Sequence, residues 1–303
     1  MERKVEKLYY DFKQFIEKNY NFGKMGKIGL TFNTPCPNYP PCSFCNASSF
    51  IPHTNRVITP IKEQISSGIP YLSKKYKTKN FIGYFQDNTS TYGDIEVLKR
   101  GYEDATSFDK IKILNISTRP DYIDKEILKA ITLSSNRKPV WIELGIQTFN
   151  ENTLKNIDRG HDLTTFYKAY NLIRKMTNFK VGLHLIIGLP EENEDDFYST
   201  AREVSRIRPD YIKISHLQIV KGSKLEKVYQ KGEIEVLDLN SYIDILGNYL
   251  GYISEDISIH RVIGSAHIDQ LIAPFWKVKH GDFFEKLYSS MKEKGIKQGS
   301  LLI

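Results

Sequence analysis

Cysteine is scarce in this sequence: three copies occur among 303 residues, and all of them fall between Cys36 and Cys45. So few cysteines exclude the disulfide framework that holds many small secreted domains together. No run of about 18 apolar residues occurs, which excludes a transmembrane helix. The N-terminal stretch Met-Glu-Arg-Lys-Val-Glu-Lys lacks the apolar centre of a secretory signal. We therefore expect a cytoplasmic protein that does not enter a membrane.

Linkers and repeats are missing as well. No stretch is rich in glycine, proline or serine, and hydrophobic residues make up 40% of the chain, which favours a compact domain over disorder. The formal charge is +7 and the pI is about 9.0, a balance that favours polyanionic partners such as nucleic acid. Residues 74–79 and 277–297 are basic with interspersed aromatic residues, and each segment is either an RNA-facing surface or an ordinary solvated face.

Strand-like segments alternate with helix-like segments from residue 27 to about residue 220. Strands are expected at residues 27–32, 81–86, 111–117, 140–148, 179–187 and 211–217. Helices are expected at residues 1–20, from Thr59 and Pro60 onward with an interruption near Gly68 and Pro70, and at residues 92–105, 124–133, 151–157, 163–176 and 194–207. The alternation predicts a parallel α/β sheet, and its six units suit a partial (β/α)6 TIM-like barrel better than an open sheet.

Three parts follow from this pattern. Residues 1–26 form an N-terminal helical entry segment, and residues 27–220 form the barrel. Residues 221–303 form a C-terminal extension packed on the barrel, with helices near residues 241–252 and 283–294 and a strand at residues 257–262.

The three cysteines directly follow the first expected strand, in the loop Cys36-Pro-Asn-Tyr-Pro-Pro-Cys42-Ser-Phe-Cys45. In a parallel α/β fold the active site lies at the carboxyl ends of the strands, so this loop is expected there. Three thiolates can hold zinc, with His53 as the nearest fourth ligand, or an iron–sulfur cluster. A 4Fe-4S cluster on three cysteines leaves one iron open to a small molecule. The residues alone leave both metals possible.

This loop resembles the cluster loop of radical S-adenosylmethionine (SAM) enzymes, including the aromatic Phe44 before the last cysteine. The spacing of five residues between Cys36 and Cys42 is longer than the commonest family spacing, as in the YhcC/YtqA-like subgroup, which is related to the Elongator catalytic subunit. Two departures are visible: the loop after Cys36-Pro-Asn is shorter than in that subgroup, and residues 264–267 replace a Gly-Asp-Ala-Pro motif. Further similarity covers residues 45–50, 84–92, 117–121, 143–148, 159–161, 184–190 and 271–276.

The resemblance implies a 4Fe-4S cluster on Cys36, Cys42 and Cys45, with SAM bound to the open iron and cleaved reductively to a deoxyadenosyl radical. The electron donor would be a protein such as flavodoxin or ferredoxin. Subgroup members have been linked to the C5 side chain of wobble uridine in tRNA, and hydrogen abstraction beside the side-chain nitrogen of carboxymethylaminomethyluridine is a plausible step. The alternatives are a radical SAM enzyme for a small molecule or a protein, and a non-catalytic iron–sulfur or zinc protein.

The resemblance also implies a set of SAM contacts: Gln86, Ser117, Glu143, Gln147, Arg159 and His184. Gln86 and Ser117 end the second and third strands. In the fourth strand, Glu143 and Gln147 share the face opposite Val140, Ile142, Leu144 and Ile146, and the polar face is expected to line the barrel.

Arg159 resembles an arginine that meets the SAM carboxylate, and His184 stands where relatives often carry a carboxylate that contacts the ribose. Structural roles are the alternative for these residues: a polar layer for Glu143 and Gln147, a helix–helix turn for Arg159, and a packed histidine for His184. A second group, at the end of the sixth strand and just beyond, is expected to meet an anionic substrate: Lys213, His216, Gln218 and Lys221.

Overall fold

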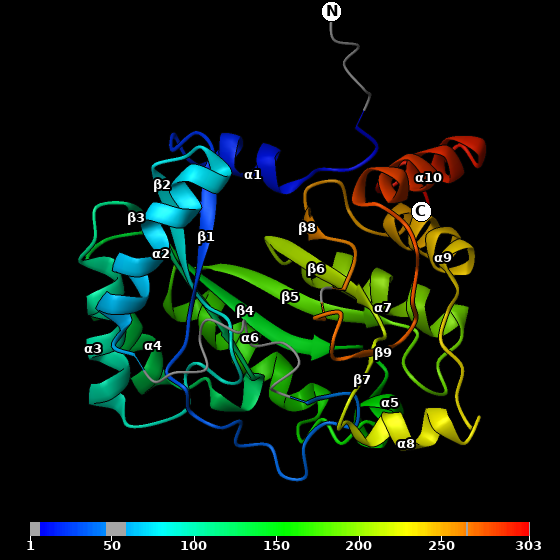
Figure 1. The fold of residues 1–303 in the computed structure, drawn as a ribbon, viewed down its shortest axis with the longest axis horizontal. Coiled ribbons are helices and arrows are strands. Elements are labelled where there is room, and N and C mark those ends of the chain that lie inside the picture. The colour runs from blue at the N-terminus through cyan, green and yellow to red at the C-terminus, as the bar shows by residue number, and fades with distance from the viewer. Residues whose placement is uncertain (1–6, 47–58, 265, 303) are drawn as a thin grey trace, which may run out of the picture.

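The computed structural model describes residues 7–46, 59–264 and 266–302. Seven strands form one sheet in the order β1-β2-β3-β4-β5-β6-β8, and every neighbouring pair is parallel (Figure 1). The strands are β1 (Met25–Leu30), β2 (Asn80–Phe85), β3 (Ile111–Thr118), β4 (Val140–Gln147), β5 (Lys180–Ile187), β6 (Tyr211–His216) and β8 (Ser258–Arg261). The sheet curls into a half-barrel, so the predicted partial TIM-like barrel is confirmed.

Helices lie on the convex face of the sheet and connect its strands. They are α2 (Ile61–Tyr76), α3 (Ile95–Thr106), α4 (Lys125–Ser134), α5 (Glu151–Asn156), α6 (Leu163–Met176) and α7 (Glu194–Ile207), with a short 3-10 helix η3 (Pro120–Tyr122). Five of these helices begin with an Asp or Asn side chain that accepts hydrogen bonds from the first turn: Asp94, Asp124, Asn150, Asp162 and Asn193. These caps fix where each helix begins, and α6 and α7 have the predicted bounds.

The segment after β6 is more closely joined to the barrel than the sequence indicated. Its strand β8 pairs with β6 and extends the main sheet. The sequence reading missed α8 (Lys224–Gln230) and the antiparallel pair of β7 (Ile219–Val220) with β9 (Leu271–Ala273). The predicted helices correspond to α9 (Leu239–Gly251) and α10 (His280–Glu293), which pack side by side.

Two helix predictions are wrong in detail. The first helix, α1, spans only Phe12–Asn19, because Asp11 forms a capping box with Gln14 that starts the helix there. Helix α2 has Pro60 rather than Thr59 at its N-cap and continues without interruption through Gly68 and Pro70. In the described residues, no helix is long and apolar enough to cross a membrane.

The sheet buries both of its faces. On the convex side, Val140, Ile142, Leu144 and Ile146 pack against the helices, as the alternation in the fourth strand predicted. On the concave side, Trp141 and Tyr211 pack with Phe15 of α1 into a separate aromatic cluster. Helix α1 therefore closes the amino-terminal end of the barrel lumen, and the segment after β1 crosses the opposite end (Figure 1).

Candidate active site

The cysteine segment lies at the carboxyl end of β1 and is anchored to two other parts of the chain. The backbone N–H of Ser43 donates to the carbonyl of Ile157 at 2.9 Å, and the N–H of Leu225 donates to the carbonyl of Ser43 at 3.0 Å. Cys42 is 5% exposed, Cys45 is half-buried and Cys36 is exposed. The loop thus presents three thiols at one edge of the barrel, as predicted from its position after the first strand.

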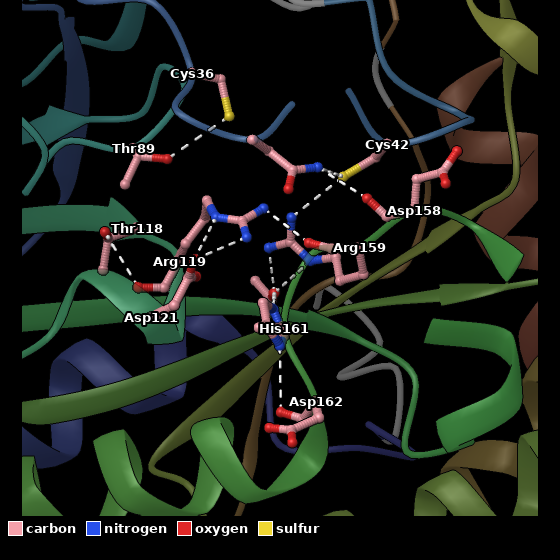
Figure 2. Close-up of polar contacts among 12 residues, drawn as sticks. Cys36, Cys42, Thr89, Thr118, Arg119, Asp121, Asp158, Arg159, His161 and Asp162 are labelled. Carbon is pink, nitrogen blue, oxygen red and sulfur yellow. Dashed lines mark hydrogen bonds and ion pairs between the residues drawn. The ribbon is translucent and has the colours of Figure 1, made fainter. Parts of the chain in front are cut away.

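Cys42 is held by two side chains. The Arg159 guanidinium donates from Nη1 to Cys42 Sγ at 3.4 Å, and the Asn38 amide donates to the same sulfur at 3.3 Å (Figure 2). Arg159 is 6% exposed, and its Nε also donates to the carbonyl of Gly145 at 3.0 Å. Gly160 has φ of +76°, and a Cβ there would lie 2.0 Å from Asn38 Oδ1, so the turn needs a glycine. The Arg159 guanidinium is therefore held between the carbonyl of Gly145 on β4 and the cysteine loop.

The donor set fits an iron–sulfur cluster. Burial raises the pKa of Cys45 to about 12, with Cys42 and Cys36 adding to the effect, so the Cys45 thiolate needs a strong positive charge such as bound iron beside it. In the described ranges, no three His, Cys, Asp or Glu side chains are placed to share one metal ion. A 4Fe-4S cluster binds each of three cysteines to a different iron. His53, the candidate fourth zinc ligand, lies outside the described residues.

Beneath this loop, Glu143 is the centre of a buried polar network across the lumen. Its carboxylate is completely buried and accepts from Tyr84 at 2.6 Å, Asn115 at 2.8 Å and Tyr211 at 3.0 Å. His184 Nε2 lies 2.6 Å and Lys213 Nζ 2.5 Å from the same carboxylate. Each of the strands β2 to β6 thus contributes at least one side chain to the network around the Glu143 carboxylate.

The surroundings of this network determine its charge state. Burial alone would raise the pKa of Glu143, but Lys213 and His184 outweigh burial and hold the pKa well below its usual range. Burial lowers the pKa of His184 to about 4, so this ring is neutral at pH 7. Burial also lowers the pKa of Lys213, against the opposing attraction of Glu143. The lumen therefore favours an ionised Glu143 and resists any positive charge that lacks a partner.

Two cavities lie on either side of His184 and Arg261. A cavity of about 190 Å³ is lined by Cys45, Gln147 and His216 together with those two residues. A larger cavity of about 980 Å³ opens sideways between β1 and β8, and we call it the lateral cavity. The lateral cavity is lined by Gln86, Tyr84, Lys27, Lys213 and His260, among others. Because both cavities share His184 and Arg261, the lumen leads from the open side of the barrel toward Cys45.

The predicted SAM contacts are thus distributed over several places. Gln147 and His184 reach the cavity beside Cys45, and Gln86 reaches the lateral cavity. Gln147 has φ of +76° at a register shift between β4 and β5, which directs its side chain out of the regular strand pattern. The Glu143 carboxylate and the Arg159 guanidinium are engaged by protein groups, and Ser117 is 8% exposed and lies opposite Glu143 in the strand register. Direct contacts of these six residues with SAM stay a prediction.

The four residues of the expected anion-binding group lie in different surroundings. Lys213 is 3% exposed and paired with Glu143, and His216 is 5% exposed with its ring 3.9 Å from that of Trp276. Gln218 lines the cavity of about 190 Å³ and Lys221 is exposed, so contact of this group with an anionic substrate stays a prediction.

Sequence reasoning missed Lys27 and Arg261, which line the lateral cavity. For Lys27 the available signal was a basic residue in the middle of a short strand, β1.

A parallel half-barrel with a three-cysteine loop after its first strand defines a class of protein: barrel enzymes built around an iron–sulfur cluster. The chain belongs to the Radical SAM superfamily, whose family model matches residues 31–204, and the model of the Radical_SAM C-terminal domain matches residues 209–293. Its cofactors are a 4Fe-4S cluster and SAM.

Within this superfamily the chain is YhcC/YtqA-like and related to the Elongator subunit. It is 32% identical over 286 residues to protein YhcC of Escherichia coli, covering 92% of this chain and 91% of that protein. It is 28% identical over 301 residues to YtqA of Bacillus subtilis, covering 97% and 93%. A shorter match, 28% over 188 residues, covers 61% of this chain and 33% of the tRNA uridine(34) acetyltransferase of Methanocaldococcus jannaschii.

Solved structures share the fold at low identity. The archaeal Methanocaldococcus infernus Elp3 superposes with a TM-score of 0.69 at 18% identity, over 90% of this chain and 64% of that chain. Streptococcus suis SuiB bound to S-adenosylmethionine superposes with a TM-score of 0.55 at 13% identity, over 80% and 51%. At these identities the similarities show a shared fold and nothing more.

Proposed function

We propose that this radical SAM enzyme modifies the C5 side chain of wobble uridine in tRNA. The observation that carries the proposal is the match to the tRNA uridine(34) acetyltransferase, which covers 61% of this chain. The net charge of +7 also suits a tRNA substrate, because contacts to phosphates supply most of the non-specific affinity for RNA. The proposal requires a cytoplasmic protein and a low-potential electron donor such as flavodoxin or ferredoxin.

The proposed ligands of the 4Fe-4S cluster are Cys36, Cys42 and Cys45. When bound, the cluster supplies the electron for cleavage of SAM to a deoxyadenosyl radical, which takes a hydrogen atom from the substrate. Arg159 and Asn38 hold the Cys42 sulfur in place through their hydrogen bonds. Phe44 and Cys45 form one wall of the small cavity that Gln147 and His184 complete.

We assign the SAM contacts accordingly. Gln147 and His184 border the cavity next to Cys45, where SAM bound at the open iron would extend. Gln86 borders the lateral cavity. Glu143 and Ser117 act indirectly: Glu143 accepts from His184 and fixes its ring, and Ser117 lies beside Glu143 in the strand register. The hydrogen bond to Glu143 thus orients the His184 ring, and burial keeps that ring neutral by lowering its pKa.

The experiment that tests the substrate compares the modified nucleosides of bulk tRNA from a deletion strain and its parent. Accumulation of an unfinished wobble-uridine side chain, reversed by the wild-type gene and not by a Cys45→Ala variant, is the expected result. A wobble-uridine profile that does not change on deletion would remove the tRNA substrate. The radical SAM chemistry would then need another substrate.

A further inference from the structure

The lateral cavity carries a charge pattern that the cluster and SAM do not use. Among the described residues, its charged lining consists of Lys27, Lys213 and Arg261 on the sheet and one carboxylate, Glu63, on α2. Glu63 is exposed at the start of the helix, so it lies at the rim. Lys213 is already paired with Glu143. The other two cations of the barrel wall form no ion pair with any residue that the structure describes.

Lys27 is the first of these cations. Its ammonium lies 4.8 Å from the centre of the Phe12 ring and 5.8 Å from that of Tyr84, and it forms no ion pair with any of the described residues. Burial lowers its pKa, and the attraction of Glu143 opposes this effect. The two rings and the longer-range attraction of Glu143 stabilise this ammonium, and its hydrogen-bond donors have no acceptor among the described residues and are available to a ligand.

Arg261 is the second. Its Nη2 donates to Ser215 Oγ at 2.9 Å, while its Nε is buried and has no hydrogen-bond partner in the described ranges. A buried guanidinium N–H without an acceptor is unfavourable, so this atom marks a place where an acceptor belongs. The strand register places Arg261 opposite Lys213, and Lys213 opposite His184, which brings the guanidinium to the point shared by the two cavities.

We propose that the lateral cavity is the substrate pocket and that Lys27 and Arg261 bind a carboxylate of the substrate within it. The planar fork of Arg261 matches a carboxylate, and Lys27 supplies a second charge from β1, across the open side of the barrel. Two free cations facing one rim carboxylate suit a monoanion better than a doubly charged phosphate. Tyr71 on α2, which is 66% exposed, lines the same cavity and offers a ring on which a base can stack.

This inference rests on the proposed function, because it names the part of the wobble side chain that the cavity recognises: the carboxylate of carboxymethylaminomethyluridine. The bond adjacent to the side-chain nitrogen would then lie between the anchored carboxylate and the uracil ring. The pocket thus selects substrates that carry a carboxylate a few atoms from the reacting carbon.

The test measures binding of free nucleosides to the reconstituted holoprotein with SAM, by calorimetry under anaerobic conditions. The probes are 5-carboxymethylaminomethyluridine and its neutral carboxamide. We expect the acid to bind about tenfold or more tightly than the amide, because the amide cannot form the charged contacts. Lys27→Met and Arg261→Gln should each remove most of this preference, while Lys79→Met, which removes an exposed lysine outside the cavity, should retain it.

Several outcomes would overturn the assignment: equal binding of acid and amide, a preference unchanged in both variants, or no binding of either nucleoside at millimolar concentration. Inorganic phosphate that displaces the nucleoside while a simple carboxylate such as succinate does not would instead make this a phosphate site. If succinate binds in preference to succinamide and both variants abolish this, but neither nucleoside binds, the carboxylate pocket stands and the tRNA substrate fails. Conversely, equal nucleoside binding together with an altered tRNA profile in the deletion strain would refute only the pocket.

Discussion

The polar network around Glu143 makes a strong prediction about stability. Glu143→Gln keeps the shape of the side chain and removes its charge from a site that is completely buried. The change leaves Lys213, which is 3% exposed, without its counter-charge, and it places an NH₂ group where two or three donors now converge. Removing one partner of a buried ion pair costs about 3–5 kcal/mol, whereas losing a neutral hydrogen bond costs about 1 kcal/mol.

We therefore expect the free energy of unfolding of Glu143→Gln to fall by about 3–5 kcal/mol, measured by urea denaturation of protein without cluster. Glu285→Gln, an exposed position on α10, is the matched control and should change stability by about 0.5 kcal/mol or less. The double variant Glu143→Gln/Lys213→Met should recover much of the loss, because both charges are then gone. A single variant within about 1 kcal/mol of wild type would refute the reasoning, as would a double variant in which the losses simply add.

Three further predictions follow from the site and the core. Cys45→Ala should lose bound iron and sulfide together with SAM cleavage while its circular dichroism is unchanged, and a variant that retains the cluster would contradict the ligand assignment. Arg159→Met should shift the reduction potential of the cluster to more negative values, on the order of tens of millivolts, because a cationic donor to a ligand sulfur is lost; Lys155→Met, an exposed control, should shift it much less. The third concerns acid stability. Burial holds the pKa of His216 at about 3, below the ordinary value of 6.5, so the unfolded chain binds more protons between these pH values. The free energy of unfolding therefore falls with decreasing pH, and His216→Phe should reduce that slope by about 1.4 kcal/mol per pH unit between pH 6 and pH 4. Parallel stability curves for variant and wild type would count against a neutral, buried His216.

Local patterns predicted the fold well where each element carried its own signal. The alternation of Val140, Ile142, Leu144 and Ile146 with Trp141 and Glu143 assigned the two faces of β4 correctly, because side chains alternate along any strand. The bounds of α6 and α7 were predictable because Asp162 and Asn193 cap them. Local signals were weaker for Pro70, which is accommodated inside α2, and for the two-residue strand β7.

Contacts between elements were much less predictable. The ring of Tyr211 packs directly over Gly182, where a Cβ would lie 2.2 Å from it, and this contact joins β5 to β6. The guanidinium of Arg159 contacts Cys42 and Gly145, while its expected contact with SAM stays a prediction. Each outcome depends on the register of neighbouring strands and the curl of the sheet, which no single segment encodes.

The sequence by itself determined the class of fold and the position of the three cysteines after the first strand. Three cysteines in one short loop and a strand–helix alternation are local features. Local features do not depend on contacts with distant parts of the chain. Only the tertiary structure decided which charged residues form ion pairs with one another and which line a cavity without such a partner. Lys27, Glu143, Lys213 and Arg261 come from four strands that are far apart in the sequence, and it is the closing of the half-barrel that pairs Lys213 with Glu143 and leaves Lys27 and Arg261 facing the lateral cavity.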